Sequence, residues 1–320
     1  MKRIAVLRGG PSDEYAVSML SGQAVLEALR ETNYITKDIV ITKKGTWLDS
    51  GFERQPDAAL EGVDVVFIAL HGAFGEDGQL QRLLHRKHIP YTGSSALASA
   101  LAFNKAAAKR ALMQHGVKMP LHIVLKGEGL WNVQSEIDNI FNHLGTDLFI
   151  KPIASGSSVG ARKIANQPDL EEALDELLPL YGEVLIEERI QGREATVGIL
   201  EDFRNERHYV LPPVEIIPPT DAHFFDQKVK YDGTTTELCP GNFSYDEKLS
   251  LADIAVRAHK ALGCTQYSRT DFIVGNDGIY FLEVNTLPGL TKESLFPKAA
   301  DAVGLSFNNL VLHLVDTAKV

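Results

Sequence analysis

The chain has 320 residues, 44% of them hydrophobic, which is enough for two or three domains with a sizeable core. Its 32 basic and 42 acidic side chains give a formal net charge of −10, which argues against a general binder of nucleic acids or membrane surfaces. Cys239 and Cys264 have no CxxC or Cys/His spacing, so we expect no zinc site and no need for disulfides. No run approaches the roughly 20 apolar residues of a membrane span, and the sequence predicts a soluble, cytoplasmic protein.

The first part of the chain alternates apolar runs with a helical pattern, which is typical of an α/β unit. Strands are expected at 3–7, 37–42 and 63–70, the last nearly all apolar, as an interior parallel strand should be. The first and third end at Gly9-Gly10 and His71-Gly72. Ligands bind beyond the carboxyl ends of such strands, so these two turns mark a candidate site.

A helix is expected between the first two strands, from Ser12 to Leu29. Ser12 is the expected N-cap, with Asp13 and Glu14 in the first turn, where acidic side chains favour the helix dipole. The stripe expected to face the core comprises Val17, Leu20, Ala24 and Ala28.

The middle of the chain predicts a second α/β region. An alanine-rich helix is expected from Ser94 to about Gln114, with Lys105 and Lys109 on one face. The other expected elements are strands at 122–126, 147–153, 183–190 and 193–200 and a helix over 168–178. The segment 217–241 has little periodicity, and a loop of this length is usually a functional lid or disordered.

A β-hairpin is predicted over 269–285. Asn276-Asp277-Gly278 suits a three-residue loop that pairs Gly275 with Ile279. Counting back places Asp271 opposite Glu283 and Arg269 opposite Asn285, and alternation puts these four side chains on one face. The opposite face is then apolar and should be the core face, with Thr270, Phe272, Val274, Tyr280, Leu282 and Val284.

Two directly opposed carboxylates repel each other, so Asp271 and Glu283 need compensation. A set of oxygen ligands without histidine or cysteine suits Mg²⁺, which often bridges to substrate phosphates. The alternative is a surface face on which Arg269 neutralises the carboxylates.

The stretch KPIASGSSVG, residues 151–160, places glycines and serines directly after a lysine. It is either a flexible turn between strands or a loop whose N–H groups lie against phosphates.

Taken together, these stretches resemble the D-alanine–D-alanine ligases of the ATP-grasp superfamily. The similarity occurs in family order over nearly the whole chain, in the segments 9–22, 70–81, 89–94, 151–160, 187–200, 228–231, 268–272 and 283–300. The resemblance implies an ATP-grasp fold of three α/β domains, the first Rossmann-like. The expected boundaries are 1–94 for the N-terminal substrate domain, 95–185 for the central domain and 186–320 for the C-terminal domain.

The resemblance also implies an activity: ATP-dependent joining of two D-alanines through an acyl phosphate, for peptidoglycan precursor synthesis. The implied cofactors are ATP and two Mg²⁺ ions, with Mn²⁺ as a substitute, and the implied assembly is a homodimer. Two alternatives stay open, namely a related ligase forming a depsipeptide or another amino-acid pair, and a non-catalytic ATP-binding module with this fold.

The resemblance assigns nucleotide-binding roles residue by residue. Lys105 and Lys151 correspond to the phosphate lysines, although Asn104 stands where the family more often has Asp. Backbone groups from Glu187 to Ile190 correspond to the adenine site, and Glu194 to the ribose site. The full expected nucleotide-binding set is Lys105, Lys151, Gly156, Ser157, Ser158, Val159, Glu187, Glu188, Ile190, Glu194 and Lys230. The plain alternatives are solvated lysines and an ordinary strand pair.

The remaining assignments concern substrate, metal and lid. Glu14 corresponds to the acid that binds the first ammonium group, Ser294 to the residue that binds the second carboxylate, and Arg269 to the residue that stabilises the oxyanion. Ser157 and Tyr231 correspond to the pair that connects with Glu14 and orders the lid. The expected substrate contacts are Glu14, Val17, Ser18, His71, Arg269, Gly289, Ser294 and Leu295, and the expected metal ligands are Asp271, Glu283 and Asn285. Alternatively, Glu14 only interacts with a helix dipole, His71 is structural and Ser294 is only an N-cap.

Overall fold

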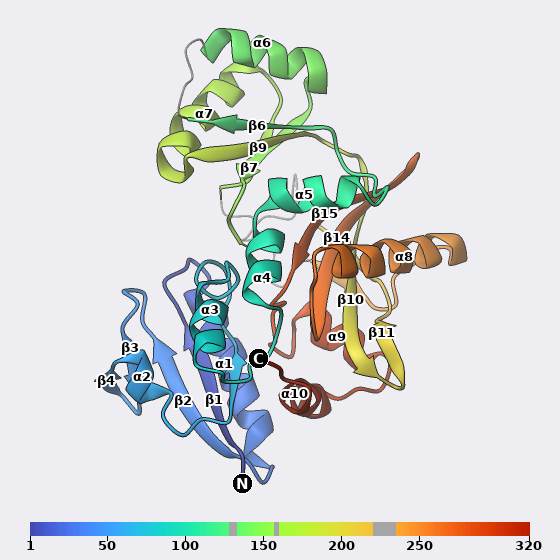
Figure 1. Cartoon of the computed structure of the whole chain (residues 1–320). Helices are drawn as coiled ribbons and strands as arrows, with labels where there is room; N and C mark the ends of the chain where they lie inside the picture. Colours follow the sequence, from blue (N-terminus) through green and yellow to red (C-terminus); the bar gives the residue numbers. More distant parts are fainter. Residues whose placement is uncertain (128–132, 157–159, 220–234) are drawn as a thin grey trace.

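The structure is a computed structural model, and it describes residues 1–127, 133–156, 160–219 and 235–320 (Figure 1). Three β-sheets form its framework, each with its own helices. The fold is therefore a mixed α/β architecture, as the sequence predicted. Within the described part of the chain, no helix combines the length and apolarity needed to cross a bilayer.

The N-terminal sheet has the strand order β4-β3-β2-β1-β5, and β1 runs parallel to both of its neighbours. Its strands are β1 (Arg3–Gly9), β2 (Ile35–Ile41), β3 (Trp47–Asp49), β4 (Phe52–Arg54) and β5 (Val65–Ile68). Its helices are α1 (Tyr15–Arg30), α2 (Pro56–Ala59) and α3 (Gln79–Arg86). The three strands predicted here are confirmed, and the ends of β1 and β5 lie side by side because these strands pair directly.

Two expectations for α1 were wrong. The helix begins at Tyr15, and Ser12 does not cap it, because the Ser12 hydroxyl donates to the carbonyl of His71 at 2.7 Å. Leu20 is 63% exposed, whereas Ala28 is buried as expected, so the buried stripe only partly matches the predicted one. The buried residues are Ser18, Ser21, Gly22, Val25, Leu26, Ala28 and Leu29, and their small side chains let α1 lie close to β1.

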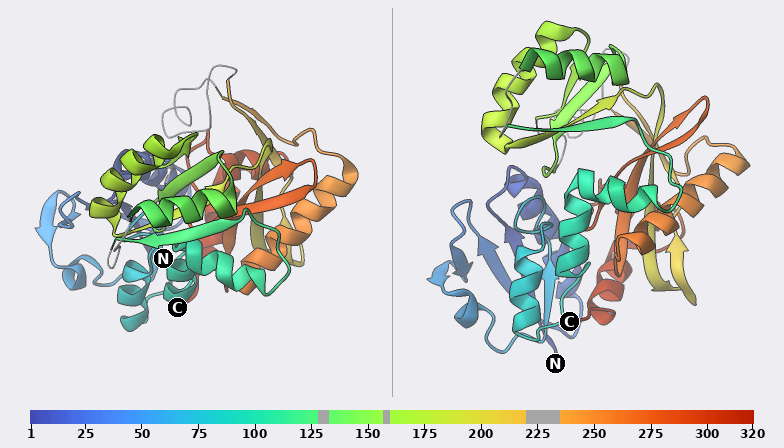
Figure 2. Two further views of the ribbon diagram at one scale, coloured as in Figure 1. Left: turned by 90° about the horizontal axis from the view of Figure 1, so that it is seen from above. Right: turned by 45° about the horizontal axis from the view of Figure 1, so that its top comes forward.

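The middle sheet has the strand order β6-β9-β7-β8, and all of its pairs are antiparallel. Its strands are β6 (His122–Lys126), β7 (Leu148–Pro152), β8 (Arg162–Ile164) and β9 (Glu183–Glu188), and its helices are α6 (Val133–Leu144) and α7 (Gln167–Tyr181). Both helices pack on the sheet face that is turned away from the rest of the molecule, over a small apolar core of their own (Figure 2).

The third sheet has the order β13-β12-β10-β14-β15, with β11 paired to β10. Its strands are β10 (Gly192–Phe203), β11 (Glu206–Val210), β12 (Val214–Ile217), β13 (Thr236–Leu238), β14 (Tyr267–Gly275) and β15 (Gly278–Asn285). Its helices are α4 (Ala96–Phe103), α5 (Lys105–Met113), α8 (Tyr245–Ala261), α9 (Leu295–Asp301) and α10 (Phe307–Asp316). Helices α4, α5 and α8 share one core with this sheet, whereas α9 and α10 join the core of the N-terminal sheet. The C-terminus returns there through a bridge between Tyr91 and Lys319.

The segment 217–241 is only partly described. It contains the short strand β13, which the sequence did not predict, and 220–234 lies outside the described residues.

The hairpin β14–β15 corrects the predicted turn but keeps the predicted pairing. Gly275 pairs with Gly278, not with Ile279, so the turn is one residue shorter than expected. A register shift next to Asp271 then places Asp271 opposite Glu283 and Arg269 opposite Asn285. The extra residue in the bulge is Leu282, which offsets the missing turn residue.

The bulge also changes which side chains of β15 face the core. Between the turn and the bulge, Ile279 and Phe281 oppose Val274 and Phe272 and belong to the same apolar core. Tyr280 and Leu282 were expected on that face and are not part of this core, because the bulge reverses the alternation. The other predicted core-face residues, Thr270, Phe272, Val274 and Val284, are buried.

The alanine-rich stretch forms two helices, not the single helix that was expected. Asn104 has extended backbone angles, ends α4 and caps α5, with its side-chain oxygen accepting from Ala107 N at 2.9 Å. Because Lys105 follows directly, the cap positions that side chain at the first turn of α5.

We expect Asn104→Ala to lower the free energy of unfolding by about 1 kcal/mol, because an uncapped α5 leaves a backbone N–H unsatisfied. The measurement is urea denaturation followed by circular dichroism. Asn104→Asp is the matched control, since its carboxylate can accept the same hydrogen bond. Equal losses in both variants would show that the cap contributes nothing.

Candidate active site

The candidate site lies where the ends of the three sheets approach one another. The carboxylate of Glu14 lies against the backbone of Gly72, where a Cβ atom would come within 2.8 Å of Glu14 Oε2, and even closer against Gly156. Glycine is therefore required at both positions for this approach. A cavity of about 170 Å³ opens here, lined in part by Glu14, Gly72, Phe103, Ser155 and Gly156.

Lys105 joins the loop after β7 to the hairpin β14–β15. Its ammonium group donates to the carbonyl of Ser155 at 2.7 Å and lies 3.2 Å from Glu283 Oε2. Its backbone N–H donates to Ile153 O at 2.9 Å, and the residue is 8% exposed. The structure thus brings a predicted phosphate lysine, the glycine-rich loop and a predicted metal ligand together.

Lys151 belongs to a buried cluster with Glu187 and Lys109. Glu187 Oε2 lies 2.6 Å from Lys151 Nζ, and Glu187 Oε1 lies 2.6 Å from Lys109 Nζ. Burial alone would raise the pKa of Glu187, but the two ammonium groups lower it to about 2. Burial lowers the pKa of Lys109, whose side chain is fully buried and also lies over the ring of Phe281.

The carboxylate of Glu187 is consequently taken up by lysines, and its backbone is paired with His122 of β6 and Phe149 of β7. Lys109 was not predicted as a site residue, although its spacing of four from Lys105 was visible.

The other predicted adenine and ribose residues surround the junction between β9 and β10. Glu188 ends β9, and its carboxylate accepts from Leu121 N at 2.8 Å. Ile190 is half-buried in the connection between the two strands. Glu194 is half-buried on β10, between β12 and β14.

The predicted metal ligands lie on one face of the hairpin. Arg269 donates to both oxygens of Asp271, at 2.9 and 2.8 Å, and Thr196 donates to Asp271 Oδ1 at 2.6 Å. Asn285 Oδ1 accepts from Leu287 N at 3.0 Å and keeps a second lone pair.

The opposed carboxylates therefore each have a cation beside them, Arg269 for Asp271 and Lys105 for Glu283. Two carboxylates and an amide oxygen on paired strands make an all-oxygen donor set that fits Mg²⁺.

Two predicted substrate residues have structural roles. Ser18 is fully buried, and its hydroxyl donates to Ala69 O and accepts from Gly9 N, both at 2.7 Å, so its single proton is already used. The ring nitrogens of His71 lie 2.8 Å from Ser21 Oγ and 3.0 Å from Leu287 O. Burial lowers the pKa of His71 to about 4, so the ring is neutral at neutral pH and positions the segment after β15. Val17 is half-buried on α1 nearby.

The segment between β15 and α9 holds the last predicted contacts. Ser294 stands at the N-cap position of α9 but makes no capping hydrogen bond, and its hydroxyl accepts from Thr291 N at 3.1 Å. Gly289 lies so near that a Cβ atom there would be 2.8 Å from Ser294 Oγ. Leu295, the first residue of α9, is half-buried. Ser157, Ser158, Val159, Lys230 and Tyr231 lie outside the described residues.

Comparison with known proteins tests the resemblance. The family model for the D-ala D-ala ligase C-terminus matches 112–316, and the model for the N-terminus matches 3–59 and 49–94. The D-alanine–D-alanine ligase of Syntrophotalea carbinolica is 38% identical, over 100% of this chain and 97% of that protein. The chain belongs to the D-alanine–D-alanine ligase family.

Solved structures of this ligase family share the fold. The D-alanine–D-alanine ligase of Bacillus anthracis complexed with ATP superposes with a TM-score of 0.81 at 30% identity, over 99% of this chain and 97% of that one. The VanG D-Ala:D-Ser ligase from Enterococcus faecalis gives 0.84 at 30% identity, over 98% of both chains. These likenesses confirm the predicted ATP-grasp fold.

Glu76 lies beside Gly72 in the candidate site and was not predicted from the sequence. It is 7% exposed, and its carboxyl group accepts from Gly72 N at 2.8 Å. Burial and the nearby charge of Glu14 raise its pKa to about 8. Its presence in the matched segment 70–81 was the only signal, because a glutamate between two exposed-looking turn residues reads as a surface charge.

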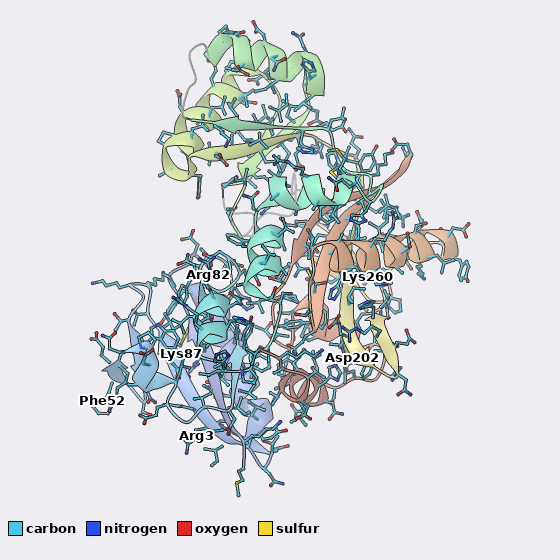
Figure 3. All side chains as sticks on the ribbon, viewed as in Figure 1. Arg3, Phe52, Arg82, Lys87, Asp202 and Lys260 are labelled. Carbon is cyan, nitrogen blue, oxygen red and sulfur yellow. The ribbon has the colours of Figure 1, made fainter. Side chains whose placement is uncertain are left out.

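Arg82 is exposed on α3 (Figure 3).

We expect Glu187→Gln to cost about 3 to 5 kcal/mol of stability, because it leaves two buried ammonium groups without a counter-charge. Urea denaturation measures the loss, and Glu188→Gln is the neighbouring control that can still accept from Leu121 N. Adding Lys109→Met to Glu187→Gln should recover part of the loss. If Glu187→Gln is no less stable than Glu188→Gln, the cluster is not a source of stability.

The raised pKa of Glu76 predicts that the stability of the protein depends on pH. Its folded pKa of about 8 lies above the usual 4.5, so the native state holds a proton that the unfolded state has lost between these two pH values. The contribution of Glu76 to the free energy of unfolding is therefore complete below pH 4.5. It falls as pH rises towards 8, by up to about 1.4 kcal/mol per pH unit.

Glu76→Gln should remove this dependence, so that the free energy of unfolding of the variant rises relative to that of the wild type as pH increases. Denaturation curves from pH 5 to about 8 test it, with the exposed Glu61→Gln as control. A stability difference that does not change with pH would contradict the raised pKa.

Proposed function

We propose that the chain joins two D-alanines into D-alanyl-D-alanine at the expense of ATP, in the cytoplasm, for peptidoglycan precursor synthesis. The observation that carries this proposal is the position of Lys105, which contacts both the glycine-rich loop at Ser155 and the predicted metal ligand Glu283. A nucleotide phosphate held by that loop would lie beside the ammonium group of Lys105. It would also lie beside the predicted metal face, which is the side of the hairpin that carries Asp271, Glu283 and Asn285. The family membership supplies the substrates.

The reaction has two steps. A carboxylate oxygen of the first D-alanine attacks the γ-phosphorus, a carbon–oxygen–phosphorus link forms, and the bond to ADP breaks. The amine of the second D-alanine then attacks the acyl carbon, a carbon–nitrogen bond forms, and phosphate leaves. Both steps move negative charge between oxygens, which fixed cations stabilise.

The chain's own residues divide this work. Glu14 would hold the first ammonium group beside Gly72 and Gly156. Lys105 and Lys151 would hold the phosphates, and Arg269 would face the oxyanion of the tetrahedral intermediate. Mg²⁺, when bound, neutralises charge on phosphate oxygens, and Asp271, Glu283 and Asn285 would hold it.

Further details of the proposal rest on the resemblance. They are the second Mg²⁺ ion, replacement by Mn²⁺, the domain boundaries 1–94, 95–185 and 186–320, and the lid pair Ser157 and Tyr231. A homodimer is also proposed on this basis, and light scattering of the purified chain tests it.

The deciding experiment is ATP turnover with D-alanine, D-serine, D-lactate or L-alanine as second substrate, with products identified by mass spectrometry. We expect ADP release that depends on D-alanine, and the dipeptide as main product from mixtures. The similarity to a D-Ala:D-Ser ligase makes D-alanyl-D-serine the rival product. Binding of ATP without amino-acid-dependent ADP release would instead identify a non-catalytic module.

The metal face supplies a sharper test. Asp271→Asn and Glu283→Gln should each lower turnover by at least about 100-fold, because each removes a charged oxygen ligand from the phosphates. Asp277→Asn, in the exposed turn of the same hairpin, is the matched control. Turnover is measured across a Mg²⁺ titration, and thermal melts check the fold. Near-normal turnover of both variants at low Mg²⁺ would refute this role.

A further inference from the structure

A second cluster of ligating side chains lies outside the candidate active site. Glu201 near the end of β10 pairs across the sheet with His208 of β11, and His259 comes from the last turn of α8. Figure 3 labels the chain neighbours Asp202 and Lys260, which mark the ends of β10 and α8 on the same side of the molecule. One ligand atom from each of Glu201, His208 and His259 lies within 4.8 Å of the other two.

The atoms of this cluster are buried and face one another without hydrogen bonds. Glu201 and His259 are 4% and 1% exposed. Glu201 Oε1 lies 3.6 Å from His208 Nδ1 and 3.6 Å from His259 Nε2. Both imidazole nitrogens are buried without a hydrogen-bond partner in the described structure. Buried polar atoms normally have partners, so this arrangement requires an explanation.

The surroundings orient these atoms. Ser268 Oγ lies 2.7 Å from His259 Nδ1, which turns Nε2 towards the carboxylate. The backbone N–H of Gln266 donates to Glu201 Oε2 at 3.0 Å and leaves Oε1 facing the two rings. Outer hydrogen bonds of this kind commonly position metal-ligating histidines and carboxylates.

We propose that Glu201, His208 and His259 form a binding site for a divalent transition metal ion of the Zn²⁺ class. Ligands about 2.0–2.1 Å from a tetrahedral zinc lie about 3.3 Å apart, and Glu201 Oε1 lies 3.6 Å from each of the two imidazole nitrogens. Two imidazoles and a carboxylate are a nitrogen–oxygen set that zinc accepts, unlike the all-oxygen set at the hairpin. The cysteine spacings predicted no zinc site, whereas these three side chains come from three separate elements, β10, β11 and α8.

One cation already competes for this carboxylate. Arg207 Nη2 lies 3.6 Å from Glu201 Oε1, but its side chain is 62% exposed and its other terminal nitrogen lies 3.4 Å from Asp202 Oδ1. Arg207 can therefore turn to Asp202 when a metal ion binds. The fourth coordination position would open towards His208, the more exposed of the two histidines.

The test uses the full chain, stripped of metal and kept in excess Mg²⁺ so that the all-oxygen site does not take up the probe. Zn²⁺ is titrated calorimetrically, and Co²⁺ is added separately because tetrahedral cobalt absorbs more strongly in the visible than octahedral cobalt. We expect one Zn²⁺ per chain and a tetrahedral Co²⁺ spectrum. His208→Gln should weaken Zn²⁺ binding by at least about 100-fold, since even outer-shell changes cost about 10–100-fold.

Further variants keep the test decisive. His208 is partly exposed, so His208→Gln should fold even if the buried His259→Gln does not. His115→Gln, at an exposed histidine, is the matched control and should bind normally. Arg207→Gln should tighten binding by about five-fold, the effect of removing one nearby charge across water. Absence of Zn²⁺ binding, or equal uptake by His208→Gln and the wild type, would show a buried imidazole–carboxylate group without metal and overturn the proposal.

Discussion

The geometry of the site depends on a carboxylate held between two ammonium groups in the interior. The pair of Glu187 on β9 with Lys109 on α5 ties the middle sheet to the helix that carries Lys105, and the pair of Glu187 with Lys151 links β9 to β7 within that sheet. Removing three charges from water costs free energy, and their mutual attraction offsets that desolvation cost only while all three stay in place. Two lysines and one glutamate also leave one net positive charge, which suits a phosphate-binding region.

The same logic extends to the hairpin. Lys105 lies against Glu283, and Arg269 lies against Asp271, so positive and negative groups alternate from β9 to β15. Such pairs hold long side chains in defined positions, which lowers the entropy lost when a charged ligand binds. A phosphate can take over the lysine contacts while a cation takes over the carboxylates. In the proposed function, the network would exchange these internal ion pairs for contacts with a nucleotide and its metal.

Sequence patterns predicted most strands and the pairing of Asp271 with Glu283, but details that depend on tertiary contacts could not be predicted. The hairpin shows why, since a turn predicted one residue too long was offset by a bulge at Leu282 that no local pattern marks. Ser12 was expected to cap a helix, yet its hydroxyl donates a hydrogen bond to the carbonyl of His71. The break at Asn104 was hidden because alanines on both sides favour one continuous helix.

Burial also decided which charged residues matter. Lys109 and Glu76 carry ordinary charges in the sequence, and only the fold shows that they are buried beside other ionisable groups. Leu20 shows the opposite case, because its apolar side chain was expected in the core and is exposed.

The strand β10 connects the two sets of proposed metal ligands. Thr196 in its middle donates to Asp271 on the metal face, and Glu201 near its end faces His208 and His259. Strand β10 pairs with β14 over the whole length from Gly192 to Leu200, so the two strands cannot shift separately without breaking that ladder. A metal ion at Glu201 would anchor α8 and β11 to the strand that positions Asp271. The proposed site would thus act on the rigidity of the sheet that carries Asp271 and Glu283, and not on the proposed reaction itself.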